Sequence, residues 1–176
     1  MKKTTMAAAA AFVTSLALAT PAYAQDEAAK AEVFVGASAG YHDIGGGFEG
    51  DDGGIYGAVA GFDFPVGESL FLGAEANYHL GDGAIDNEYG VAARAGVRLG
   101  GNTKLYVKGG YQEVDFDLVS ILGGNPPPGA DDSDGDYIVG VGAEIGFGST
   151  PVKLRLNADT IAFDSTRLTA GVLFAF

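Results

Sequence analysis

Two histidines are the side chains in this sequence best suited to act as a general base near neutral pH, and the chain contains no cysteine. Hydrolysis by a serine nucleophile needs such a base within hydrogen-bond reach and a third group that orients the base. His42 and His79 are the two candidates, and neither is followed by a serine two positions later. We expect His42 at the edge of a connection and His79 at the loop end of its strand, pointing inward, each as an incidental polar residue. The sequence therefore predicts a protein that is not an enzyme.

The segment 132–136 has the alternating oxygen ligands of a calcium-binding loop. In such a loop a glycine follows at the sharp turn, and a bidentate glutamate completes the coordination. Here Tyr137 occupies the position of the glycine, and no suitably spaced glutamate follows. The sequence therefore predicts neither a resident metal ion nor a cofactor.

Charged residues at alternate positions of apolar segments form the strongest candidate site. Successive side chains of a β-strand point to opposite faces, so these residues share one face. Neighbouring strands lie about 4.8 Å apart, which allows Glu75 to pair with Arg94, and Glu144 with Lys108 or Arg155. We predict an ion-pair network that fills the interior, with a gated solute path as the alternative. The predicted members are Glu75, Arg94, Arg98, Lys108, Glu144, Lys153, Arg155 and Asp159, with Asp63 as a further inward acid.

The segments that carry these residues alternate between apolar and polar with a period of two. After a short polar segment that ends at Lys30, no stretch of the chain holds a helical apolar period. Each alternating segment is about as long as a strand that crosses a membrane. The eight predicted strands are Glu32–Tyr41, Ile55–Phe64, Leu70–Leu80, Tyr89–Leu99, Lys104–Gln112, Tyr137–Phe147, Val152–Thr160 and Arg167–Phe176.

The connections between these strands alternate in length. Longer connections on one rim and short turns on the other are typical of barrels in bacterial outer membranes. Fifteen of the 23 acidic residues fall in or beside the connections of the rim that carries the longer ones, with Asp164 in the compact Ile161–Thr166 included, which makes that rim strongly negative. The longer connections are His42–Gly54, Gly81–Glu88 and Glu113–Asp136; the shorter ones are Pro65–Ser69, Gly100–Thr103, Gly148–Thr150 and the compact Ile161–Thr166.

The two faces of the strands differ in a way that separates a membrane barrel from a soluble one. One face is apolar throughout, and twelve strand glycines lie on the charged face against Gly109 alone on the apolar face. A solvent-facing surface has no need to lose side chains, whereas the interior of an eight-stranded barrel holds few. The sequence therefore predicts an all-β, eight-stranded antiparallel up-and-down transmembrane barrel, and disfavours a soluble secreted barrel.

Aromatic residues mark both ends of the apolar face. Tyrosines lie beside the longer connections and phenylalanines beside the short turns. Amphipathic rings favour the boundary between membrane and water, so two such bands indicate a surface that faces lipid. The predicted girdle residues are Tyr41, Tyr56, Tyr78, Tyr89, Tyr111 and Tyr137 in one band, and Phe64 and Phe147 in the other.

The N-terminus has the form of a secretory signal peptide. Lys2 and Lys3 precede an apolar run, and the small-residue segment 22–24 forms a cleavage site before Gln25. The run is shorter than the roughly 20 residues of a spanning helix. We expect residues 1–24 to be removed and residues 25–176 to form one barrel domain. The mature chain would carry eight basic and 23 acidic residues, a formal net charge of −15, which argues against nucleic acid as a partner.

Three segments together resemble the small outer-membrane β-barrel family that includes the opacity-type porin-like proteins and the transmembrane domain of OmpA. They are Leu105–Tyr111, Gly140–Glu144 and the alternating residues from Leu168 that end at Phe176. Their order, spacing and terminal position carry the resemblance, which covers Glu32–Phe176.

The resemblance implies an integral protein of the Gram-negative outer membrane that contributes to envelope structure and surface contacts without catalysis. A narrow passive pore for small solutes is the alternative. Phe176 is then an assembly signal for the barrel-assembly machinery, reached with the help of periplasmic chaperones. Outer-membrane lipid and lipopolysaccharide are the implied partners, a surface ligand could contact the acidic connections, and a monomer is expected.

Overall fold

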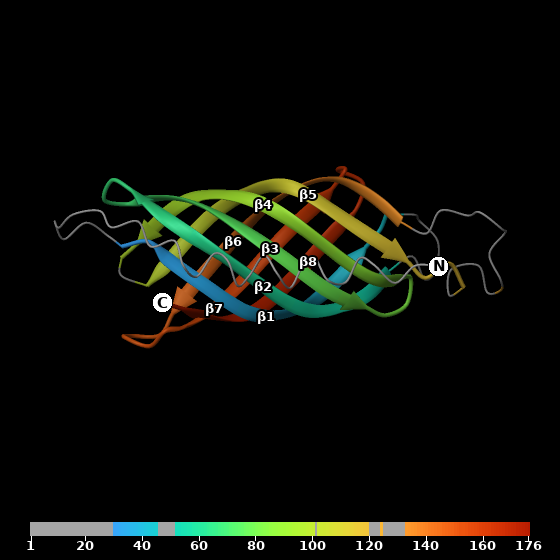
Figure 1. The fold of residues 1–176 in the computed structure, drawn as a ribbon, viewed down its shortest axis with the longest axis horizontal. Helices are drawn as coiled ribbons and strands as arrows, with labels where there is room; N and C mark the ends of the chain where they lie inside the picture. Colours follow the sequence, from blue (N-terminus) through green and yellow to red (C-terminus); the bar gives the residue numbers. More distant parts are fainter. Residues whose placement is uncertain (1–29, 46–51, 101, 120–123, 125–132) are drawn as a thin grey trace, which may run out of the picture.

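The computed structural model is a closed barrel of eight antiparallel strands, each paired with its sequence neighbours, and β1 also pairs with β8 (Figure 1). It describes residues 30–45, 52–100, 102–119, 124 and 133–176. The predicted fold class is confirmed. The predicted signal peptide and residue 132 of the calcium-like segment lie outside the described residues. The strands are β1 (Glu32–Asp43), β2 (Asp52–Val66), β3 (Leu70–Gly81), β4 (Ile85–Leu99), β5 (Thr103–Phe116), β6 (Ser133–Gly146), β7 (Val152–Ile161) and β8 (Thr166–Ala175).

Side chains alternate between the interior and the outer wall, as the period of two predicts. In β5, Lys104, Tyr106 and Lys108 are buried inside the barrel, whereas Leu105 and Val107 are 44% and 57% exposed on the wall. The described part of the chain contains no helix long and apolar enough to cross a bilayer.

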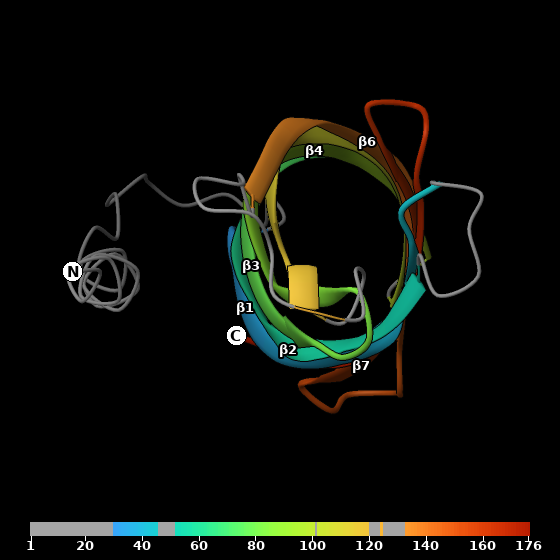
Figure 2. The ribbon, with the colours of Figure 1, turned by 90° about the vertical axis from the view of Figure 1, so that its right-hand side faces the viewer.

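The barrel closes between its first and last strands. The β1–β8 ladder runs from the pair Phe34 and Ala175 to the pair Asp43 and Thr166. Phe176 and Val33 extend it through two backbone hydrogen bonds of 2.9 Å each. Figure 2, which looks into the barrel from the rim opposite the chain's C-terminus, shows the closed ring.

The two rims differ in the connections they carry. The rim that holds the start of β1 and the end of β8, the terminal rim, carries the short β2–β3, β4–β5 and β6–β7 turns. Gly67 and Gly148 adopt φ values of 67° and 57° in two of these turns, a conformation that favours glycine. The opposite rim, the loop rim, carries the connections 44–51 and 117–132 and two shorter ones.

Several strands are longer at the loop rim than the sequence predicts. β4 begins at Ile85 instead of Tyr89, β5 continues to Phe116, and β6 begins at Ser133 instead of Tyr137. The acid-rich stretches at these ends are strand and not connection, because Ile85 and other inward apolar residues at this height pack together. Ser133–Asp136, part of the calcium-like segment, is therefore paired strand and not a connection.

Candidate functional site

A network of buried ion pairs fills the middle of the barrel. The Arg94 guanidinium, from β4, donates hydrogen bonds to Glu144 at 2.6 Å, to Glu75 at 3.1 Å and to Asp63 at 3.1 Å. These three carboxylates come from β6, β3 and β2, so one arginine joins four strands. All four side chains are almost fully buried, with exposed fractions of 0–3%.

Arg155 on β7 reinforces the same network. It contacts Glu144 at 2.7 Å and Glu75 at 3.0 Å. The structure thus contains a Glu75–Arg94 pair and a Glu144–Arg155 pair. Lys108, the other partner considered for Glu144, lies instead 3.1 Å from Glu75 and 3.2 Å from Asp159.

Inward aromatic rings hold the two guanidinium groups in place. The Arg94 guanidinium carbon lies 4.1 Å from the centre of the Tyr106 ring and 4.8 Å from that of Phe34. Arg155 lies 4.5 Å from the Phe34 ring centre. Cation–π contacts of this kind gain strength when the cation is removed from water. Each arginine is therefore fixed both by carboxylates and by rings.

The network continues to the terminal rim through two lysines. The Lys104 ammonium lies 2.6 Å from both Glu32 and Asp63, and Lys153 lies 2.5 Å from Glu32. Arg98, predicted as a member, is half-buried and forms no ion pair with the described residues.

Three of these carboxylates have the spacing of a cation site. Ligand oxygens of Glu32, Asp63 and Glu144 lie within 4.8 Å of one another. The ammonium of Lys104 lies near all three, at 2.6, 2.6 and 3.9 Å. The protein's own side chain thus supplies the positive charge that a metal ion would bring.

A second buried cluster lies nearer the loop rim, around Glu88. Its carboxylate contacts His42 at 2.8 Å, His79 at 3.3 Å and Arg167 at 2.5 Å. Arg167 also contacts Asp159 at 2.9 Å, which joins this cluster to the central network. His42 is the last residue but one of β1, beside the connection that follows, and its side chain is 1% exposed inside the barrel. It is buried there because β1 continues to Asp43 and β4 begins before Glu88.

Both histidines contact a serine as well as Glu88. The Ser38 hydroxyl lies 2.8 Å from His79 Nε2, and the Ser165 hydroxyl lies 3.4 Å from His42 Nε2. Two serine–histidine–glutamate arrays thus share one carboxylate, an arrangement that resembles a hydrolytic triad. A void of about 10 Å³ lies beside Ser38 and His79, enough for about one water molecule. A substrate would have no room beside this array.

An apolar layer covers this cluster on the side of the loop rim. It consists of one inward residue from each of five strands, all nearly inaccessible to solvent, and Ile44 and Phe116 pack against it. Side chains of this kind exclude water, and the layer lies at the end of the barrel that the ion pairs do not occupy. The five residues are Ile55, Ile85, Val114, Ile138 and Ile161.

Sequence reasoning missed several members of the interior. Lys104 and Arg167 stand at inward positions of predicted strands, an even number of residues from Lys108 and Thr169 respectively. The alternation of period two could therefore have identified both. Glu88 carried no such signal, because it fell at the end of a predicted connection.

The predicted girdle tyrosines all lie on the outer wall, 40–56% exposed. Tyr78 and Tyr89 are register partners on β3 and β4, as are Tyr111 and Tyr137 on β5 and β6. The rings therefore lie side by side around the barrel. Near the terminal rim, the exposed aromatic residues are Phe64, Phe147, Phe174 and Phe176.

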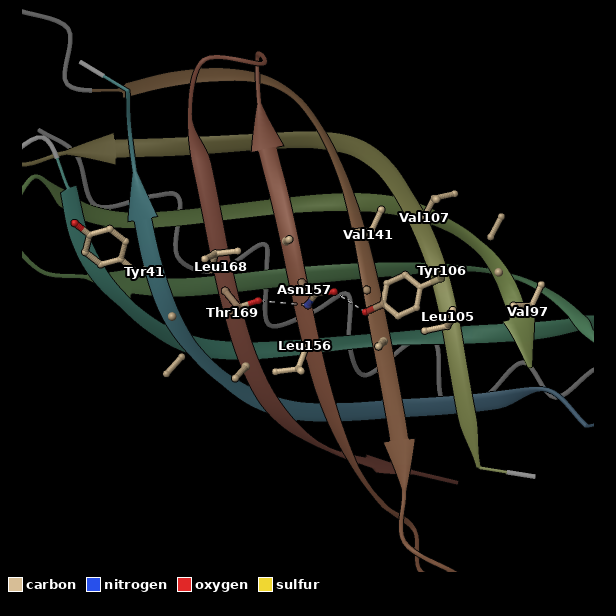
Figure 3. Close-up of a pocket in the computed structure, with 18 residues that line it drawn as sticks. Tyr41, Val97, Leu105, Tyr106, Val107, Val141, Leu156, Asn157, Leu168 and Thr169 are labelled. Carbon is tan, nitrogen blue, oxygen red and sulfur yellow. Dashed lines mark hydrogen bonds between the residues drawn. The ribbon is translucent and has the colours of Figure 1, made fainter. Parts of the chain in front are cut away.

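The outer wall also carries a broad apolar hollow of about 980 Å³ (Figure 3). Outward residues such as Leu105, Val141 and Leu156 line it, and they are about half exposed. Beneath its floor, the Asn157 amide bridges the hydroxyls of Tyr106 and Thr169, as the dashed lines in Figure 3 mark. This hollow therefore lies on the apolar wall and not among the ion pairs of the interior.

A closed barrel with an ionic interior and an apolar, aromatic-banded wall has its polarity reversed relative to a soluble protein. A family model described as the outer membrane protein beta-barrel domain matches residues 8–172. The chain belongs to this family. The outer-membrane barrel is therefore located in the bacterial outer membrane, where its apolar wall contacts lipid and its strands span the bilayer.

Solved structures share this fold at low sequence identity. The Ail protein of Yersinia pestis, the attachment invasion locus protein, is similar with a TM-score of 0.53 and 13% identity, over 83% of this chain and 97% of Ail. Neisserial surface protein A is similar with a TM-score of 0.54 and 16% identity, over 86% of this chain and all of that protein. Curated protein sequences give no match. These likenesses support the fold of the outer-membrane barrel and leave its role to the geometry of its own residues.

Proposed function

We propose that this outer-membrane barrel is a non-enzymatic structural protein of the envelope whose interior is closed to solutes. The observation that carries the proposal is the continuous filling of the interior. From the terminal rim, the Lys104 cluster, the Arg94 network, the Glu88 cluster and the apolar layer around Ile85 follow one another. Because each layer is held by side chains from several strands, a solute path would require many contacts to break together.

The same filling argues against catalysis. The two serine–histidine–glutamate arrays are buried, and the adjoining void holds about one water molecule. Charge-assisted hydrogen bonds to Glu88 instead serve to satisfy the buried polar groups of His42, His79 and Arg167.

In planar lipid bilayers, the purified barrel is expected to give no stable single-channel openings. The measurement compares wild type with Glu68→Ala, a change at an exposed residue in the β2–β3 turn that leaves the interior intact. Frequent, stable openings of both proteins would contradict the closed interior. They would instead support the alternative function, a narrow passive pore for small solutes.

The geometry also favours a definite set of lipid partners. We propose that the acyl chains of outer-membrane lipid and lipopolysaccharide cover the apolar wall, including the hollow of Figure 3. By the usual orientation of such barrels, the loop rim faces the cell exterior. Of the eight basic residues after Lys3, none is exposed at that rim, since Arg167, the nearest to it, is 2% exposed.

This charge distribution sets the barrel apart from one of its structural neighbours. Ail has been solved in complex with sucrose octasulfate, a heparin analogue and therefore a polyanion. Exposed acids such as Asp43, Asp86 and Asp164 at the loop rim would repel a ligand of this type. We propose that any surface ligand of this chain is cationic or binds through divalent cations.

We further propose that residues 1–24 direct export and are cleaved, and that Phe176 is the signal for barrel assembly. Phe176 is 74% exposed on the wall, and its backbone pairs with Val33 at the seam of the barrel.

Intact-mass measurement of outer-membrane fractions is expected to show a chain that begins at Gln25. Deletion of Phe176 is expected to reduce the barrel in that fraction; an intact N-terminus, or full recovery of the shortened chain, would contradict these roles.

A further inference from the structure

The wall of the barrel is not equally high all the way around. The β5–β6 ladder continues to the pair Asp115 and Ser133, whereas the β6–β7 ladder ends at the pair Ile138 and Ile161. The first residues of β6 therefore have a partner strand on one side alone. In Figure 1, the beginning of β6 (orange) extends farther to the right than the β7–β8 turn (red). We call residues Ser133–Asp136 the β6 edge.

The backbone of this edge presents hydrogen-bonding groups to the open side. The carbonyl of Tyr137 accepts a hydrogen bond of 3.0 Å from the amide of Ala162, so Tyr137 directs its backbone groups towards β7. In an antiparallel strand, alternate residues point their backbone groups to the same side. Gly135 and Ser133 therefore direct theirs to the open side, where they make no backbone hydrogen bond with the described residues.

The β6 edge lies in water rather than in lipid. Tyr137 belongs to the exposed tyrosine band that marks the outer boundary of the membrane, and the edge lies beyond it along β6. On the neighbouring strand β5, Glu113 is the register partner of Gly135 and points outward. An outward carboxylate at this height is unsuited to contact with lipid. An exposed strand edge in water is a template for another extended segment.

The charges around the edge define which segment fits. Asp134 and Asp136 lie within it, Glu113 lies on the adjacent strand, and Asp164 lies in the β7–β8 turn. No basic side chain is exposed at this rim. A second copy of the chain would bring its own edge aspartates against these, which disfavours self-association. A basic segment would find both free backbone groups and opposite charges.

An exposed aromatic pair lies at the base of the edge. The Tyr137 and Phe163 ring centres are 5.4 Å apart, and Phe163 is 70% exposed. Ala162 and Phe163 both have positive φ, 54° and 62°, which residues other than glycine adopt at a cost. This turn conformation keeps the Phe163 ring beside Tyr137, where it can contact an apolar side chain of a bound segment.

We propose that the β6 edge binds an extended, basic polypeptide segment by strand addition on the outer surface of the cell. The segment would pair with the open backbone groups of Gly135 and Ser133, and its basic side chains would lie near Asp134. This interaction surface is additional to the closed interior and does not depend on it.

The first test uses synthetic peptides and the purified barrel in zwitterionic lipid nanodiscs. The probe is a ten-residue peptide that alternates lysine and threonine, with binding followed by fluorescence anisotropy at low and high salt. We expect saturable binding that weakens as salt rises. The same peptide with N-methyl groups on alternate residues keeps its charge but loses the backbone N–H donors on one side. We expect this methylated peptide to bind about tenfold more weakly than the parent peptide. No binding of the parent peptide, or equal binding of the methylated or an all-glutamate counterpart, would overturn the proposal.

The second test uses two variants at one position of the edge. Gly135→Ala and Gly135→Pro both add a Cβ, which meets only the ends of the Tyr111 and Glu113 side chains. Only the proline variant removes the open-side amide, and we expect it to bind the peptide about fivefold more weakly than the alanine variant. Asp134→Asn should weaken binding about threefold, while Glu68→Gln at the opposite rim should not. Heat-modifiable migration on gels verifies that each variant is folded. Equal affinity of the two Gly135 variants would overturn strand addition, and single-channel recording tests the closed interior separately.

Discussion

Glu144→Ala is expected to lower the free energy of unfolding of the barrel by about 3–5 kcal/mol. The Glu144 carboxylate lies 2.6 Å from Arg94 and 2.7 Å from Arg155, and all three side chains are almost fully buried. Its removal leaves two guanidinium groups to share Glu75, while Arg94 keeps Asp63 as well. A buried charge that has lost its partner costs more than the pair contributes, because the remaining ion is still removed from water.

The measurement is reversible urea unfolding in lipid vesicles. The folded fraction is monitored by heat-modifiable migration on gels and by far-ultraviolet circular dichroism. Glu68→Ala provides the matched control, since it removes the same carboxylate from an exposed turn, and its effect should stay below about 0.5 kcal/mol. A loss below about 1 kcal/mol for Glu144→Ala would mean that water reaches the interior and screens the arginines. The closed interior would then be wrong.

The interior shows which parts of the site follow from sequence. Glu144 and Arg155 are register partners on the neighbouring strands β6 and β7, so alternation and strand spacing were enough to suggest the pair. Arg94 and Glu144 lie on β4 and β6, which are not neighbours. Their contact depends on how the strands are staggered when the barrel closes, and a period of two contains no information about that stagger.

The loop rim shows the opposite case. Its strands were expected to end at the tyrosine girdle because aspartates and glycines follow it. Inward residues such as Ile85 and Val114 continue the alternation beyond that point, and their burial in a shared cluster extends the ladder. Glu88 and His42 then come to lie inside the barrel. Composition indicated a solvated connection, whereas the packing of a few isoleucines determined the structure.

The glycines complement the arginines. Long inward side chains can fill a narrow barrel only where their neighbours on the same face are small. Tyr106, which lies 4.1 Å from the Arg94 guanidinium carbon, occupies the space beside Gly142, where an added Cβ would lie 2.3 Å from its ring. The excess of glycine on the inward face thus makes room for the inward side chains, and it can be tested separately from the charges.

Two adjacent glycines of β5 provide that test, because they point to opposite sides of the wall. A Cβ on Gly110 would lie 2.0 Å from the carbonyl oxygen of Val91 and 2.5 Å from the Cα of Ala92. Both atoms belong to the backbone of β4, so the strands would have to move apart. Gly110→Ala is therefore expected to destabilise the barrel by about 1–3 kcal/mol.

Gly109→Ala, one residue earlier, is expected to have the opposite sign. A Cβ there approaches only the carbonyl oxygen of Ile138, at 3.8 Å, and projects from the outer wall. Alanine loses less conformational freedom on folding than glycine, which should raise the free energy of unfolding by about 0.5 kcal/mol. Urea unfolding of the two variants side by side measures the difference. Equal effects would mean that the inward and outward faces of β5 are wrongly assigned, since the substitution is chemically the same and only the side of the wall differs.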